Sequence, residues 1–180
     1  MAQRVRSLTG LPLKKLTTTT FHAFGMGVLK QYIHHLGFKN NFTVYDTNDR
    51  KALMKEVIQN LDYVVESFDL FELSSLFSDI KTKRKVFGPN ASDKIRNLYY
   101  EYEKHLKAYN AVDFDDLIMK PLELFDKHPE ILDELRERYS HILVDEFQDT
   151  SLSQYRMVEL LAQESRNLCV VGDDDQSIYS

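Results

Sequence analysis

The sequence has one cysteine, no tryptophan and no long hydrophobic run, and these shortages exclude several classes of protein. With Cys169 alone, neither an intrachain disulfide nor a cysteine metal cluster can form, so a reducing, cytoplasmic setting is expected. No apolar run approaches the roughly 20 residues that a membrane-spanning helix needs, and the N-terminus has no hydrophobic signal segment. The sequence therefore predicts no membrane partner.

Glycine is also scarce, with six among 180 residues, and none is followed by lysine. The phosphate-binding loop G-x-x-x-x-G-K-[ST] is therefore absent from the sequence. The net charge of −5 argues against nonspecific binding of nucleic acid by the whole surface. It does not exclude a local DNA groove, because much of the acid is concentrated in two short segments near the C-terminus.

The first acidic segment is HILVDEFQDT, at residues 141–150, where residues 142–145 form an expected buried strand. Asp145 and Glu146 follow its apolar run directly, and Asp149 comes three residues later. Ligands of open α/β sheets bind outside the carboxyl ends of the strands. In a nucleotide-hydrolysing site, such an acid would hold Mg²⁺ and its neighbour would orient the attacking water. An acidic surface turn explains this segment alone equally well.

The second acidic segment, NLCVVGDDDQSIYS, repeats this design with an expected strand at Leu168–Val171. Between the two segments, Ser151 and Gln154 have the S-x-x-Q spacing of a helix capping box. Strand, helix and strand in this order indicate a βαβ unit with a parallel sheet. We expect the β-branched run Leu16–Thr20 to be a neighbouring parallel strand, and Asp145 and Asp173 to lie at the same sheet edge.

Residues 23–126 have helical periodicity almost throughout, and we expect them to form helices and connecting loops around a small core of their own. The basic run KTKRK, at residues 81–85, is either a solvated loop or a patch that follows a phosphate backbone. The aspartates at 113, 115 and 116 could be mistaken for a metal site, but helix capping and the helix dipole are a sufficient explanation. The aromatic residues between 99 and 109 are expected in a helical core rather than on a base-stacking surface.

Four segments resemble motifs of the superfamily-one DNA helicases of the UvrD, Rep and PcrA type. DEFQDT and VVGDDDQSIYS resemble motifs II and III, TTFHAFG resembles motif Ib, and DFDDLI resembles the short DNA-contacting motif before motif II. They occur in the family's order, and GDDDQSIYS resembles the Rep branch most closely. The resemblance implies an α/β fold: a partial RecA-like parallel sheet of the P-loop NTPase type at residues 1–22 and 127–180. The large all-helical insertion would then be residues 23–126.

The resemblance also implies residue roles. Asp145 would bind Mg²⁺, Glu146 would polarise the hydrolytic water, and Gln176 would sense the γ-phosphate of ATP. Two further acids, Asp149 and Asp173, would support that network at the nucleotide. The residues expected along the path of the DNA strand are Thr20, Phe21, His22, Phe114 and Tyr179.

The parent protein is then expected to be an ATP-dependent DNA helicase that uses Mg²⁺, translocates on single-stranded DNA and unwinds duplexes in replication or repair. Its partners would be single-stranded DNA, junctions of single and double strands, and the remaining motor domains. Because the phosphate loop is missing, we expect the 180-residue chain to be an internal fragment that is inactive alone. Two alternatives stay open: a two-metal nuclease built on Asp145, Glu146 and Asp173–Asp175, and a non-catalytic helical interaction module.

Overall fold

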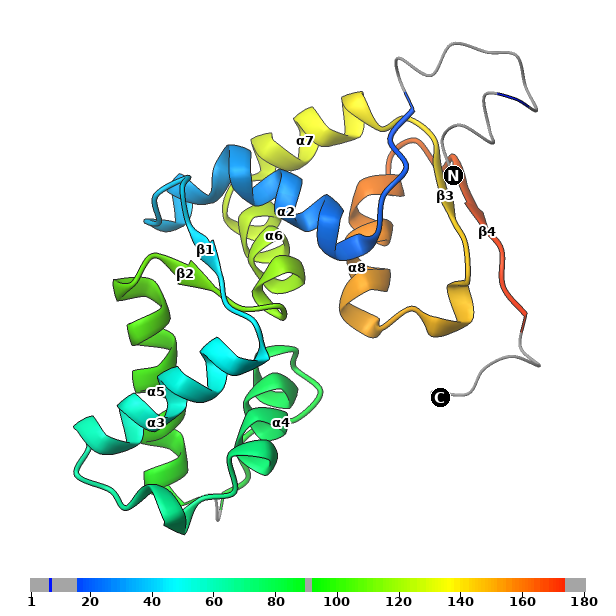
Figure 1. Cartoon of the computed structure of the whole chain (residues 1–180). Coiled ribbons are helices and arrows are strands. Elements are labelled where there is room, and N and C mark those ends of the chain that lie inside the picture. The colour runs from blue at the N-terminus through cyan, green and yellow to red at the C-terminus, as the bar shows by residue number, and fades with distance from the viewer. Residues whose placement is uncertain (1–6, 8–15, 90–91, 174–180) are drawn as a thin grey trace.

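The computed structural model describes residues 7, 16–89 and 92–173, which are mostly helical with two small parallel sheets (Figure 1). The described elements, in chain order, are α2 Phe21–Tyr32, η1 Ile33–Leu36, β1 Thr43–Val44, α3 Thr47–Asn60, η2 Val65–Ser67, α4 Leu70–Lys81, α5 Asp93–Ala108, β2 Ala111–Val112, α6 Asp116–Lys127, α7 Pro129–Arg138, β3 Ile142–Val144, η3 Phe147–Asp149, α8 Leu152–Ala162 and β4 Leu168–Val170. Among the residues described, no helix combines the length and the apolar composition needed to cross a membrane.

Two helices, α3 and α8, begin at capping boxes. Asp46 caps α3 by accepting from the backbone amides of residues 48 and 49, and the Asp49 side chain accepts from the Asp46 amide in return. Ser151 and Gln154 form the same reciprocal arrangement at the start of α8. The predicted capping box is therefore confirmed, since each partner satisfies an amide that has no acceptor within its helix.

The apolar side chains gather into two cores. One core is formed by helices α2, α6, α7 and α8, and the other by α3, α4 and α5. In Figure 1 the second group lies at the lower left and the first group in the upper middle, with β1 and β2 where the chain passes between them and the β3–β4 pair at the right. The helices of residues 23–126 are thus shared between both cores, because α2 and α6 pack with α7 and α8. The domain division at residues 22/23 and 126/127 stays a prediction.

Strands β3 and β4 are parallel neighbours, as the sequence predicts, with Leu143 opposite Cys169. The expected burial of these strands is wrong for most positions. Val144 is buried at 6% exposure, whereas Leu143 is 67% exposed and Val170 is 46% exposed. Within the described part of the chain, the two strands have no further strand beside them, so much of the small sheet faces solvent.

Two strand expectations need correction. Residues 16–20 are not a strand: they are exposed, carry no sheet pairing, and end in Thr20, whose side chain caps α2. β-Branched residues favour a strand only where a partner strand is present. Conversely, residues 23–126 are not purely helix and loop, because β1 and β2 pair in parallel, with Thr43 opposite Ala111. This two-residue ladder joins the segments that connect the two cores.

Candidate functional site

The two acidic segments meet at one edge of the β3–β4 sheet. Pairing continues past the strand ends, where the Val171 amide donates to the Val144 carbonyl at 2.8 Å and the Phe147 amide donates to the Val171 carbonyl at 2.9 Å. Gln148 then links the two segments: its Nε2 donates to Glu146 Oε2 at 2.8 Å, and its Oε1 accepts from the Asp173 amide at 3.1 Å. Segments 25 residues apart in sequence thus share one side chain, and the sequence reasoning did not identify this glutamine.

At this edge of the sheet the backbone of Glu146 is strained and that of Gly172 is closely packed. Glu146 has a positive φ of 54°, the left-handed region that non-glycine residues rarely adopt. A Cβ on Gly172 would lie 2.7 Å from Gln148 Oε1, so a larger residue there would require the Gln148 amide to shift. Such constraints are typical of segments that hold a polar group in a defined position.

The carboxylate of Asp145 is suited to a magnesium ion. The residue is exposed, and its Oδ1 accepts from the Glu146 amide at 3.2 Å. Its Oδ2 has no hydrogen-bond partner among the described residues. Mg²⁺ in nucleotide sites is held by one or two carboxylates together with phosphate oxygens and water, so one accessible carboxylate fits. In the described ranges no group of three or more acidic, histidine or cysteine residues could hold a metal by itself.

The other nucleotide-site candidates are only partly described. Asp149 ends the short helix η3, and its amide donates to the Glu146 carbonyl at 3.0 Å. Gln176, Tyr179 and the remaining acids of the second segment lie outside the described residues.

Four of the five expected DNA-contacting residues are described, and the structure brings His22 of α2 beside Phe114, two residues before α6. The His22 and Phe114 rings lie with centroids 5.0 Å apart, and Phe114 is 53% exposed. Burial lowers the pKa of His22, and the negative charge of Asp115 opposes this shift. Phe21 packs against the first core, and Thr20 accepts a hydrogen bond from the Ala23 amide at 3.3 Å. Within this set Thr20 and Phe114 are exposed, and His22 is half-buried beside the Phe114 ring.

Directly behind Phe114 lies a buried ion cluster that the sequence reasoning missed. The ammonium group of Lys81, whose side chain is 5% exposed, lies 2.8 Å from Asp113 Oδ2 and 3.2 Å from Asp116 Oδ2. It also lies 2.6 Å from Glu103 Oε1 on α5. Lys81 was expected to be either a solvated or a phosphate-binding residue, and its burial contradicts both. Lys85 of the same basic run is exposed and paired with Asp79 at 2.7 Å.

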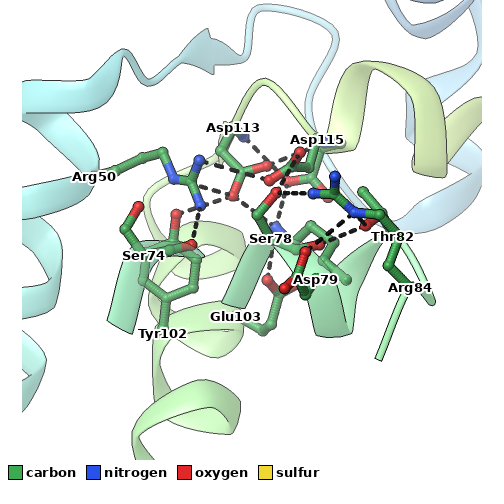
Figure 2. A network of polar contacts seen from close by, with 12 residues as sticks. Arg50, Ser74, Ser78, Asp79, Thr82, Arg84, Tyr102, Glu103, Asp113 and Asp115 are labelled. Atoms are coloured by element: carbon green, nitrogen blue, oxygen red, sulfur yellow. Dashed lines mark hydrogen bonds and ion pairs between the residues drawn. The ribbon is translucent and has the colours of Figure 1, made fainter. Parts of the chain in front are cut away.

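Figure 2 shows the outer part of the cluster. Arg50 on α3 lies 3.8 Å from Asp113 Oδ2 and 3.5 Å from Asp115 Oδ2. Ser78 on α4 donates to Asp115 Oδ1 at 3.0 Å and accepts from Arg84 at 3.2 Å. Arg50 therefore joins α3 to the turn that carries Phe114, and Ser78 joins α4 to the same turn.

The pKa values of the two buried aspartates of this turn are shifted in opposite directions. Burial raises the pKa of Asp116 to about 7; the Asp113 charge adds to this shift, and Lys81 opposes it. Burial would also raise the pKa of Asp113, but the charges of Lys81 and Arg50 outweigh it and lower that pKa. Burial likewise disfavours the charged form of Lys81, yet the carboxylates around it keep its pKa well above the ordinary value. Lys81 is therefore a permanent ammonium group.

Known proteins of one family match this chain along its length. The family model of the UvrD/REP helicase N-terminal domain matches residues 1–180. ATP-dependent DNA helicase PcrA of Staphylococcus aureus is 36% identical over 186 aligned positions, which cover 99% of this chain and 26% of that protein. The PcrA proteins of Bacillus subtilis and Staphylococcus epidermidis are 35% and 36% identical, again over 99% of this chain. The chain spans about a quarter of the length of these relatives. It belongs to the UvrD/REP helicase N-terminal domain family.

Proposed function

We propose that this chain is the part of an ATP-dependent DNA helicase in which the magnesium-binding edge of a RecA-like motor domain meets a contact for single-stranded DNA. One observation carries the proposal: two acidic segments at the ends of parallel strands converge on Gln148. That arrangement matches a nucleotide site at the carboxyl edge of a parallel sheet. The similarity to PcrA helicases supports the reaction class.

On the nucleotide side, Asp145 would hold the magnesium ion of Mg-ATP and Glu146 would orient the attacking water. When bound, the ion supplies positive charge that offsets the charge developing on the phosphates. Glu146 has the left-handed backbone at the strand end, and Gln148 fixes one of its oxygens at 2.8 Å. Gln148 would thereby pass a change at Glu146 to the segment around Asp173, through the second hydrogen bond of its amide. Gln176 would complete the site as the sensor of the γ-phosphate.

On the DNA side, His22 and Phe114 would form a stacking platform, and Tyr179 would extend it. The Phe114 side chain is 53% exposed, and the His22 ring lies tilted by 46° against it at 5.0 Å, so Phe114 would keep enough open surface for a base. Stacking of bases on aromatic side chains is worth about 1–3 kcal/mol per base and tolerates any sequence. Because the pKa of His22 is lowered, the platform is neutral near pH 7, and binding depends on ring contact rather than on added charge.

The small sheet exposes apolar residues, which supports the expectation that other motor domains of the parent protein cover it. Leu143, Leu168 and Val170 are 67%, 38% and 46% exposed. Apolar surface on a sheet is unfavourable in water, whereas further strands and helices of a motor domain would cover it. These residues would therefore pack against the remaining motor domains.

The proposal is tested by measuring binding of the purified 180-residue chain to a fluorescently labelled oligothymidine by anisotropy. Phe114→Ala should weaken binding about 5-fold or more, corresponding to the lower bound for one stacked base. Phe71→Ala is the matched control, since Phe71 lies on α4, is 75% exposed and has no ring partner among the described residues. Equal affinity of wild type and Phe114→Ala, or equal losses in both variants, would contradict the DNA contact.

A further inference from the structure

Asp113 and Asp116, on either side of the turn that carries Phe114, are joined by two hydrogen bonds. The Asp116 amide donates to Asp113 Oδ1 at 3.0 Å, and the Asp113 amide donates to Asp116 Oδ2 at 3.1 Å. These two bonds have the reciprocal pattern of a capping box, although the N-cap of α6 is Asp115, and the two aspartates are 0% and 2% exposed. Phe114 lies inside this box, so the direction of its ring depends on how the two aspartates are held.

The Lys81 ammonium group forms ion pairs with both aspartates. It reaches the same Asp116 oxygen that accepts from the Asp113 amide, at 3.2 Å, and the Asp113 Oδ2 at 2.8 Å. The Tyr102 hydroxyl donates to that Asp113 oxygen as well, at 2.9 Å. Lys81 lies on the buried stripe of α4 that also contains Leu73 and Phe77. The position of Lys81, and so of the turn, is therefore fixed by the core of α3, α4 and α5.

We propose that Lys81 is a positioning residue for the contact between Phe114 and DNA: it cross-links Asp113 to Asp116 and so holds the Phe114 ring against His22. This inference rests on the proposed function, because it presumes that Phe114 stacks on a base. Lys81 itself is enclosed by Asp113, Asp116 and Glu103, which makes it unsuited to direct contact with a phosphate. It acts through the turn alone.

Two simpler roles predict different behaviour. If Lys81 only neutralises a buried carboxylate, removing the cation and one carboxylate together should restore both folding and DNA binding. If Lys81 contacts a phosphate, its loss should reduce the salt dependence of binding, by about 0.7 in the slope of log affinity against log salt. A positioning role predicts weaker binding with an unchanged slope, and no recovery in the charge-balanced double variant.

The experiment compares Lys81→Met, Asp116→Asn, the double variant Lys81→Met/Asp116→Asn and Phe114→Ala in the 180-residue chain. Lys85→Met removes the same charge from an exposed position of the same basic run and is the control. The probe is a single strand containing 2-aminopurine, whose fluorescence falls when the base stacks on an aromatic ring. Anisotropy is measured at several salt concentrations, and thermal unfolding shows which variants are folded at the assay temperature.

We expect Lys81→Met to lose about 5-fold or more in affinity and most of the fluorescence quenching, as Phe114→Ala does, with the salt slope of wild type. The double variant should fold and still bind and quench less than Asp116→Asn. If Lys81→Met does not fold, the comparison of the double variant with Asp116→Asn tests the positioning role. Wild-type-like quenching in the double variant, a reduced salt slope in Lys81→Met, or equal losses in Lys85→Met would each overturn the positioning role. No binding by wild type, or no effect of Phe114→Ala, would instead overturn the proposed function.

Discussion

The backbone of Gly25 in α2 lies directly against the backbone of Leu117 in α6. A Cβ on Gly25 would come within 1.8 Å of the Leu117 carbonyl oxygen and 2.9 Å of its carbonyl carbon. His22 lies one turn before Gly25, and Phe114 lies one turn before Leu117. The close approach of the two helices is therefore what brings the His22 and Phe114 rings together.

Gly25→Ala should destabilise the chain, because the added methyl group meets backbone atoms that move only with their helices. Overpacking of this kind costs about 1–3 kcal/mol or more. Gly27→Ala is the control in the same helix, since a Cβ there meets no atom within 4 Å. Its expected effect is a gain of up to about 1 kcal/mol from helix propensity. Urea unfolding followed by circular dichroism measures both, and a tolerated Gly25→Ala would contradict the close packing.

The contact between His22 and Phe114 should be visible in the titration of His22, without DNA. Burial lowers the pKa of His22, so Phe114→Ala, which uncovers the ring, should raise that pKa toward its ordinary value of 6.5. Asp115→Asn removes a negative charge that favours the imidazolium and should lower the pKa further. Proton NMR of the imidazole signals measures both shifts. The two variants must move the pKa in opposite directions; equal or absent shifts would refute this geometry.

Asp116 should make the stability of the chain fall as the pH rises toward neutrality. Its pKa is raised by burial to about 7, whereas an unfolded aspartate titrates near 3.9. Between about pH 4 and pH 7 the folded state thus binds a proton that the unfolded state has lost, and the free energy of unfolding decreases with pH. Asp113, whose pKa is lowered in the folded state, contributes stability that is lost only at more acidic pH.

Asp116→Asn removes this titration and keeps a side-chain oxygen for the Asp113 amide. The free energy of unfolding of wild type minus that of the variant should therefore decline between about pH 5 and pH 7.5. Because both proteins contain every other titrating group, the difference reports the titration of Asp116 together with its coupling to Asp113 and Lys81. Urea titrations at half-unit pH steps give this difference, and a constant value across the range would mean that Asp116 is ionised throughout.

The sequence was sufficient for features that depend on a few neighbouring residues. The β-branched runs before the two acidic segments predicted β3 and β4, and their parallel pairing followed from the intervening helix. The Ser151–Gln154 box was readable because both partners lie within one helical turn. Extended residues 16–20 show the limit of this approach, since β-propensity does not supply a partner strand.

Burial of Lys81 could not be predicted from its charged neighbours, which suggested a solvated run. Its environment is built by residues 22 to 35 positions away, on α5 and at the start of α6. One signal was present: Leu73, Phe77 and Lys81 recur every fourth residue, so Lys81 continues an apolar stripe of α4. The spacing of Asp113 and Asp116 was a second signal, because it is the spacing of a capping box.

The 180-residue chain alone should not hydrolyse ATP. No glycine in it is followed by lysine, so the loop that cradles the β- and γ-phosphates in P-loop enzymes is missing from the sequence. Asp145 and Glu146 without that cationic loop repel a triphosphate, although Asp145 can still attract Mg²⁺. We expect phosphate release below about 1 s⁻¹, the low end for typical enzymes, with Mg²⁺, ATP and single-stranded DNA present. Turnover above this value in wild type that disappears in Glu146→Gln would show that the site is complete without the loop.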